Sequence, residues 1–405
     1  MNKLKIEKQG IIYPNPFLLA ASPITRTAEM IRRGFKAGWG GAVLKTISLC
    51  PETMTDVSQR ICVYKNKSSL IGLNNIEMTS NRPIEVWVKE INELKKEFPD
   101  RIIIASIMAE GEKLQEWQEL AETLQDAGVD TIELNLSCPN GVPERGMGSF
   151  ISEIPDLCGK ITEAVKKVSK VPVWAKLSPN IPDISFLAFS CLQGGADGIT
   201  AINTLKGFAG IDIESLQPKL NIGGVSTYGG FSGNIVKPFA LKAVSEIAKD
   251  NACYISATGG ISNWQDAVEF MLLGASSLQI CTEVMLKGHD VINSLIGGLE
   301  DYLERHSYTS LEDLIGLGLQ KVDDYGKLDK NVKYQANINT ESCKKCGECF
   351  TSCMDGGYQA INQKDNKTFS INVDKCVGCG LCQYVCPANA ISMVNTSALA
   401  KKIKF

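Results

Sequence analysis

Between Phe17 and about Arg305 the sequence alternates short β-branched runs with amphipathic helical stretches. We expect eight strand and helix pairs, with the strands at 17–23, 41–48, 101–109, 130–139, 171–179, 198–204, 253–260 and 276–282. Eight such units in roughly 300 residues are typical of a TIM barrel, whereas a doubly wound sheet usually stops near six strands. The sequence therefore predicts an α/β fold built on a (β/α)8 barrel.

Polar residues follow the apolar bodies of most of these strands. The residues are Lys45 and Thr46, Asn135 to Cys138, Lys176, Asn203 and Thr204, Thr258 to Gly260, and Cys281 with Thr282. In a TIM barrel the chemistry takes place where the strands end, so these residues are candidates for a site. Three connections, 49–81, 139–155 and 205–237, are longer than ordinary βα loops and indicate functional loops or lids.

Two features of these strand ends favour a phosphate-bearing, electron-accepting cofactor. Gly259, Gly260 and Thr282 follow strands seven and eight, where TIM barrels build a phosphate site. Lys45 and Lys176 occupy strand ends where a buried ammonium needs an anion, and a reduced flavin supplies one. The alternative for each lysine is a side chain that extends past the barrel rim into solvent.

Eight of the fifteen cysteines lie between Cys343 and Cys386 in two short repeats of one motif. Each repeat has the C-x2-C-x2-C-x3-C spacing of a bacterial ferredoxin, in which the fourth thiol binds the other cluster. We therefore expect two [4Fe-4S] clusters, one bound by Cys343, Cys346, Cys349 and Cys386 and the other by Cys376, Cys379, Cys382 and Cys353. Paired zinc sites are the alternative, but their thiol pairs are separated by longer spacers.

The domain organisation follows from these two patterns. We expect the barrel at 1–306, a linker at 307–336 and a ferredoxin-like domain at 337–405. Two clusters joined to a barrel indicate electron delivery to its mouth, and a flavin is the natural acceptor because it exchanges both one and two electrons.

Charge and hydropathy exclude several other classes of protein. The net charge is −3, and no block of Lys or Arg resembles a nucleic-acid-binding surface. The longest apolar runs are far shorter than a membrane span. Glu7, Lys8 and Gln9 stand where a signal peptide would need its apolar centre, so we expect a cytoplasmic protein.

Cys138 is the candidate proton donor. It precedes a proline and a glycine-rich loop, and an ordinary thiol pKa of about 8.5 keeps it protonated at neutral pH. The alternative is a small buried apolar residue, which is the usual role of a free cysteine. The two histidines lie away from the predicted barrel mouth, which favours Cys138 as the acid.

Several of these motifs together resemble the dihydroorotate dehydrogenase superfamily. They are NLSCPN at 135–140, GLNNIE at 72–77, Lys45-Thr46, and AINT at 201–204. The segments RRGFKAGWG, ERGMG, AKLSPNIPDI and GGFSG, with the twin cysteine motif, narrow the resemblance to the dihydropyrimidine dehydrogenase family. Segments similar to the FAD and nicotinamide parts of its single-chain members are absent. The chain thus resembles the FMN and iron–sulfur subunit of the bacterial two-subunit form, whose companion carries FAD and binds NAD(P)H in a hetero-oligomer.

The resemblance implies roles for named residues. Cys138 would protonate a pyrimidine base such as uracil or thymine while hydride passes from FMN. The ring would be bound by Asn75, Glu77, Asn135, Asn203 and Thr204. FMN would be held by Lys45, Thr46, Asn135, Lys176, Ser232, Gly233, Thr258, Gly259, Gly260, Cys281 and Thr282.

Two other functions compete with pyrimidine reduction. Dihydroorotate oxidation uses the same barrel and FMN, but an ionised Glu77 in the pocket would repel the orotate carboxylate. A non-catalytic iron–sulfur electron-transfer subunit is the other, and Cys138 with the two lysines argues against it.

Overall fold

The computed structural model describes residues 3–66, 69–139, 146–364 and 366–397. It divides into two compact units, Met1–Val322 and Asp323–Phe405. Residues 140–145 of the predicted loop at 139–155 lie outside the described residues.

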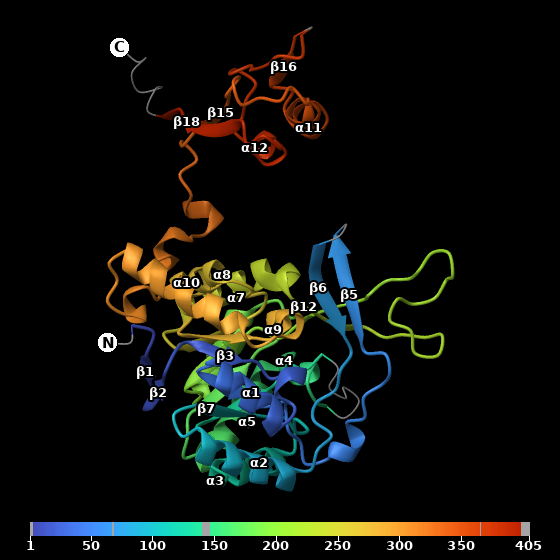
Figure 1. The fold of residues 1–405 in the computed structure, drawn as a ribbon, viewed down its shortest axis with the longest axis vertical. Helices are drawn as coiled ribbons and strands as arrows, with labels where there is room; N and C mark the ends of the chain where they lie inside the picture. The colour runs from blue at the N-terminus through green and yellow to red at the C-terminus, as the bar shows by residue number, and fades with distance from the viewer. Residues whose placement is uncertain (1–2, 67–68, 140–145, 365, 398–405) are drawn as a thin grey trace. The chain divides into compact units, whose positions relative to one another are not determined.

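The first unit contains a closed eight-stranded parallel barrel, as predicted (Figure 1). Its strands neighbour one another in chain order, and the last pairs with the first. They are β3 (Phe17–Leu19), β4 (Gly41–Val43), β7 (Ile102–Ile107), β8 (Thr131–Asn135), β9 (Val173–Lys176), β10 (Gly198–Ala201), β13 (Tyr254–Thr258) and β14 (Ser277–Ile280). Every residue of these strands is buried, as expected for a parallel sheet covered by helices.

Helices follow the strands and surround the barrel. The main ones are α1 (Ala28–Ala37), α2 (Ile84–Glu97), α3 (Leu114–Asp126), α5 (Pro155–Val168), α6 (Ile184–Gln193), α7 (Lys237–Asp250), α8 (Trp264–Leu272) and α10 (Val291–Arg305), with the short α4 (Ser149–Ser152) and α9 (Thr282–Lys287). Local chemistry sets where several begin. Asp183, for example, caps α6 by accepting a hydrogen bond of 2.8 Å from the Phe186 N–H.

A four-stranded antiparallel sheet is built from two of the predicted long connections. Its order is β11 (Leu205–Gly207), β12 (Gly229–Ser232), β6 (Ser69–Asn75) and β5 (Ile61–Asn66). Figure 1 shows β5 and β6 as a hairpin beside β12. These connections are therefore partly ordered into strands, and their pairing brings β6 next to residues more than 150 positions later, with Asn75 opposite Gly230.

The segment expected as a linker, 307–336, is shorter in the structure. Residues up to Val322 belong to the barrel unit, because Leu311 and Leu314 are buried in its core and the Gly316 N–H donates to the Met271 carbonyl. At the other end, Tyr334 already pairs with Asn395. Apolar burial and strand pairing thus take up both ends of the expected linker.

The second unit is a small α and β domain with an internal repeat. It contains β15 (Tyr334–Ile338), α11 (Glu348–Gly356), β16 (Ile361–Gln363), β17 (Phe369–Ile371), α12 (Leu381–Tyr384) and β18 (Ile391–Asn395). The strands form two antiparallel pairs, β15 with β18 and β16 with β17. Cys349 and Cys382 begin the buried faces of α11 and α12, so each repeat presents its thiols to the core of this unit.

Candidate active site and cluster sites

A large cavity opens at the C-terminal ends of the barrel strands. Its empty space, including the part open to solvent, is about 1420 Å³. Every barrel residue that the sequence singled out for a ligand lines it: Lys45, Thr46, Asn75, Glu77, Asn135, Cys138, Lys176, Asn203, Thr204, Ser232, Gly233, Thr258, Gly259, Gly260, Cys281 and Thr282. These residues come from the ends of six barrel strands and from the accessory sheet, so the fold brings them together around one space.

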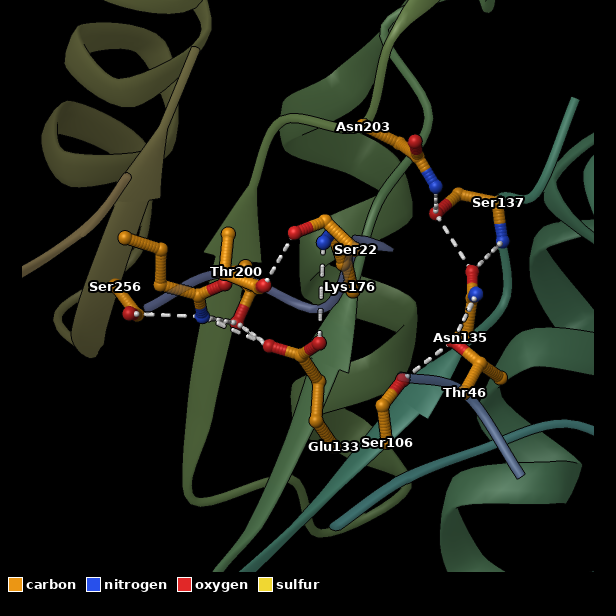
Figure 2. A network of polar contacts seen from close by, with 12 residues as sticks. Ser22, Thr46, Ser106, Glu133, Asn135, Ser137, Lys176, Thr200, Asn203 and Ser256 are labelled. Carbon is orange, nitrogen blue, oxygen red and sulfur yellow. Dashed lines mark hydrogen bonds and ion pairs between the residues drawn. The ribbon is translucent and has the colours of Figure 1, made fainter. Parts of the chain in front are cut away.

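Asparagine side chains on one wall are held by a hydrogen-bond network (Figure 2). The Asn135 amide donates to the Thr46 hydroxyl at 2.9 Å, and Thr46 lies 2.9 Å from the Ser106 hydroxyl. The Asn203 amide donates to the Ser137 hydroxyl at 2.9 Å. Because these amides are oriented by neighbours, they present fixed donors and acceptors to a ligand.

Glu77 is clamped between two cations. Its carboxylate lies 3.2 Å from the Lys45 ammonium and 3.5 Å from the Arg60 guanidinium. The Lys45 and Glu77 side chains are 6 and 7% exposed, so this is a buried ion pair at the cavity wall. The alternative of a lysine extending into solvent therefore does not hold for Lys45.

Lys176 has a different counter-ion. Its ammonium lies 3.9 Å from the Glu133 carboxylate, and the Lys176 residue is only 6% exposed. Two buried ammonium groups thus line one cavity, each beside a carboxylate. An electron-rich ligand is well matched to this arrangement.

Three glycines line another part of the cavity. Gly233, Gly259 and Gly260 have φ of 87°, 128° and 82°, in the left-handed region. A Cβ at Gly260 would lie 2.9 Å from the Lys237 nitrogen, and one at Gly259 would lie 2.8 Å from the Ala240 Cβ. Only glycine fits where Gly259 and Gly260 approach the first turn of α7, and a backbone without side chains lets a phosphate approach closely. The donor set and the cavity therefore fit FMN.

Cys138 lies three residues after the end of β8 and is 8% exposed at the cavity. Its carbonyl accepts a hydrogen bond of 2.9 Å from the Ser149 N–H, which ties the start of the predicted loop to α4. Cys281 also lines the cavity. Burial raises the pKa of the Cys281 thiol, although the Ser22 hydroxyl and the Lys176 charge partly oppose this.

Sequence reasoning missed several residues of this region. Arg60 precedes β5 and reaches Glu77, and Thr79 and Gln279 line the cavity with buried oxygen atoms that have no partner among the described residues. Glu133 is fully buried in the barrel interior. A charged residue inside the apolar run DTIELNLSCP was the one signal that pointed to Glu133.

In the second unit, two cavities are each lined by the four thiols predicted for one cluster. Their empty spaces are about 400 and 320 Å³. The first is lined by Cys353, Cys376, Cys379 and Cys382, and the second by Cys343, Cys346, Cys349 and Cys386. Burial raises the pKa of Cys382 to about 11, and the neighbouring thiols add to this shift. Four thiols around a cavity of this size fit an iron–sulfur cubane, which holds them as thiolates.

In the part of the chain that the structure describes, no helix is both long and apolar enough to span a membrane.

Comparison with known proteins agrees with this geometry. Residues 3–303 match the family model for dihydroorotate dehydrogenase, and residues 336–393 match that for a 4Fe-4S dicluster domain. The chain is 39% identical over 395 residues to the NAD-dependent dihydropyrimidine dehydrogenase subunit PreA of Escherichia coli, covering 96% of this chain and 95% of that one. It is 37% identical to the chloroplastic dihydropyrimidine dehydrogenase (NADP(+)) of Arabidopsis thaliana, covering 82 and 80%.

Two further relatives match about four fifths of this chain. The catalytic subunit of dihydroorotate dehydrogenase B (NAD(+)) from Pyrococcus furiosus is 40% identical over 79% of this chain and 99% of its own length. The crystal structure of a dihydroorotate dehydrogenase from Eimeria tenella superposes with a TM-score of 0.65 at 20% identity, over 78 and 89% of the two chains, which shows the shared fold. The chain therefore belongs to the dihydroorotate dehydrogenase family of FMN enzymes, and it carries a 4Fe-4S dicluster domain after the barrel.

Proposed function

We propose that the chain is the catalytic subunit of a dihydropyrimidine dehydrogenase, which interconverts uracil or thymine and the 5,6-dihydropyrimidine. The observation that carries the proposal is the combination of the cavity with the dicluster unit. The match to the Escherichia coli subunit spans both units. The match to the Pyrococcus subunit uses 99% of that protein but only 79% of this chain, so that protein has no counterpart of the remainder.

FMN would be held by two ammonium groups near its ring system and by glycine loops near its phosphate. Lys45 and Lys176 offset negative charge on the reduced ring system, and the loops at Gly233, Gly259 and Gly260 bind the phosphate. Ser232 and Thr282 support those loops, since the Thr282 hydroxyl donates to the Ser232 hydroxyl at 2.9 Å. When bound, FMN supplies hydride to the substrate and takes up single electrons from the clusters.

The pyrimidine ring is recognised by Asn75, Glu77, Asn135, Asn203 and Thr204. A uracil ring presents N–H donors beside carbonyl acceptors, which amides and one carboxylate can match. Glu77 accepts from a ring N–H, and the amides serve both kinds of group. The Asn75 amide donates to the Gly230 carbonyl at 3.2 Å, so the accessory sheet holds Asn75 in place.

Cys138 supplies the proton. Saturating the 5,6 double bond requires hydride at the 6-position and a proton at the 5-position. The Cys138 thiol gives its proton to the 5-position, and solvent reprotonates the thiolate that remains. In the reverse direction the thiolate accepts the same proton.

When bound, two clusters would carry electrons between FMN and a partner subunit that carries FAD and binds NAD(P)H. Their proposed ligands are the two sets of four thiols that line the cavities of the second unit. The abundance of thiols favours a reducing compartment, and we place the protein in the cytoplasm.

Oxidation of dihydroorotate is the second candidate function, and the structure changes the argument against it. Lys45 and Arg60 flank Glu77, so the carboxylate of orotate meets two cations as well as one anion. Glu77 alone is thus a weaker barrier to orotate than the sequence implied.

The deciding experiment is a single-turnover reaction. The holo-protein is reduced anaerobically and mixed with uracil, thymine or orotate while flavin absorbance is followed. Rapid reoxidation by uracil or thymine, and slow reoxidation by orotate, is the expected result. Faster reoxidation by orotate would favour the second candidate, and no reoxidation by any of the three would indicate an electron-transfer subunit.

A further inference from the structure

Glu133 is a buried carboxylate that the proposed function does not use. It lies in the middle of β8 among apolar residues, and its side chain is completely buried. Burying an ionised carboxylate is costly unless charges and hydrogen bonds compensate. The groups around Glu133 therefore indicate its role.

Two donors and one cation surround this carboxylate. Its Oε2 accepts hydrogen bonds of 2.8 Å from the Thr200 hydroxyl and of 2.8 Å from the Gln279 amide. Its Oε1 has no hydrogen-bond partner among the residues that the structure describes, and it faces the Lys176 ammonium at 3.9 Å (Figure 2). That distance is too long for a hydrogen bond, so the interaction is electrostatic and leaves the Lys176 donors available to a ligand.

The network continues from Glu133 to the cavity. The Gln279 amide also donates to the Ser256 hydroxyl at 3.1 Å, and its carbonyl oxygen is buried without a partner among the described residues. Both Gln279 and Lys176 line the cavity, whereas Glu133 does not. Glu133 thus holds two groups that face the ligand without facing it itself.

We propose that Glu133 is a positioning residue that lowers the reduction potential of the bound FMN, acting through Lys176 and Gln279. A fixed negative charge near the cavity opposes the gain of electron density on the flavin, while the Lys176 ammonium favours it. The pair therefore balances the flavin between accepting electrons and donating hydride. The inference rests on the proposed function only in that the cavity holds FMN.

The test is the flavin midpoint potential of Glu133→Gln, measured in the full-length holo-protein without any pyrimidine. Glutamine keeps the size of the side chain and removes its charge. We expect the equilibrium to shift about tenfold toward the reduced flavin, which is about 30 mV for a two-electron couple. A shift of less than about twofold in a variant that retains FMN would overturn the proposal, whatever the protein does with uracil.

Asp130→Asn is the matched control. Asp130 lies three residues earlier, just before β8, and also pairs with a lysine, Lys95, at 2.9 Å. Its carboxylate additionally accepts from the Ile103 N–H at 2.8 Å. It stands at the opposite end of the strand from the cavity, so neutralising it should leave the potential unchanged. An equal shift in this control would show a general effect of charge and overturn the specific role.

A second pair of variants covers the case in which Glu133→Gln alone loses FMN. Lys176→Gln is compared with the double variant Glu133→Gln/Lys176→Gln, which removes both members of the ion pair and avoids an unpaired buried charge. The potential of the double variant should still favour the reduced flavin relative to that of Lys176→Gln, but by less than about tenfold, because only the part exerted through Gln279 remains. Equal potentials in these two proteins would overturn the proposal.

Discussion

Replacing Glu77 by glutamine should change which pyrimidine the enzyme accepts. The substitution presents an amide donor to a ring N–H, and a mismatched buried group costs roughly 1 to 3 kcal/mol. For uracil this corresponds to a loss of about 5- to 150-fold in kcat/KM. The same substitution leaves Lys45 and Arg60 without their shared carboxylate, so the cavity wall becomes cationic.

Orotate should respond in the opposite way. Two carboxylates about 4 Å apart repel by about 4 kcal/mol at an effective dielectric of about 20. In the wild type, Lys45 and Arg60 offset part of this repulsion. We take the remaining repulsion as about 1.4 to 2.8 kcal/mol, which lowers the reactivity with orotate about 10- to 100-fold. Reactivity with orotate should therefore hold or rise while that with uracil falls.

The assay is single-turnover reoxidation of the reduced flavin by uracil and by orotate. FMN content and thermal unfolding are measured in parallel, because leaving the buried Lys45 ammonium unpaired costs roughly 3 kcal/mol of stability. Glu283→Gln is the control, since Glu283 lines the same cavity but pairs with Lys287, which is 67% exposed and stays solvated. An unchanged ratio of uracil to orotate rates in a Glu77→Gln protein that retains FMN would refute the assignment of Glu77 as a ring contact.

Three further predictions test the acid, the clusters and the pH dependence. Cys138→Ala should retain FMN and both clusters but reduce uracil about 100- to 10,000-fold more slowly, and Cys138→Ser should restore little; stopped-flow rates like those of the wild type would mean that another group is the acid. The anaerobic holo-protein should contain about eight iron and eight sulfide per chain, and Cys353→Ser should disturb the cluster of Cys376 rather than that of its own repeat, as iron analysis and paramagnetic resonance can show. Burial opposes ionisation of Glu90, but hydrogen bonds from Arg82 and a backbone N–H outweigh it and lower its pKa. Its stabilising contribution is therefore present above the unfolded-state pKa of about 4.3 and is lost as the pH falls through the lower folded-state pKa. Glu90→Gln should accordingly unfold at a lower temperature than the wild type at pH 7, with the difference closing in acid, and a difference that is constant with pH would contradict this.

The sequence by itself determined the architecture and the chemical class of the two units. Strand and helix periodicity is a local property, so the eight barrel strands were predicted within two residues at their starts, whereas their predicted ends run two to five residues too far. The cysteine spacing is equally local, and the structure gathers each predicted set of four thiols around its own cavity. Strand ends meet at one face of a barrel, and for that reason the predicted ligand residues line one cavity.

Only the tertiary structure decided which charges meet. Arg60 reaches Glu77 because β5 pairs with β6, and Glu77 reaches Lys45 because the end of β4 lies beside the same cavity. The interior network joins Glu133 to Gln279, 146 residues apart, across the closed barrel. Such contacts depend on barrel closure and on the pairing of distant loops, and no local pattern in the chain records them. The same long-range pairing makes Glu77 both a proposed ring contact and the counter-ion of Lys45, so its charge cannot be changed without altering the cofactor side of the site.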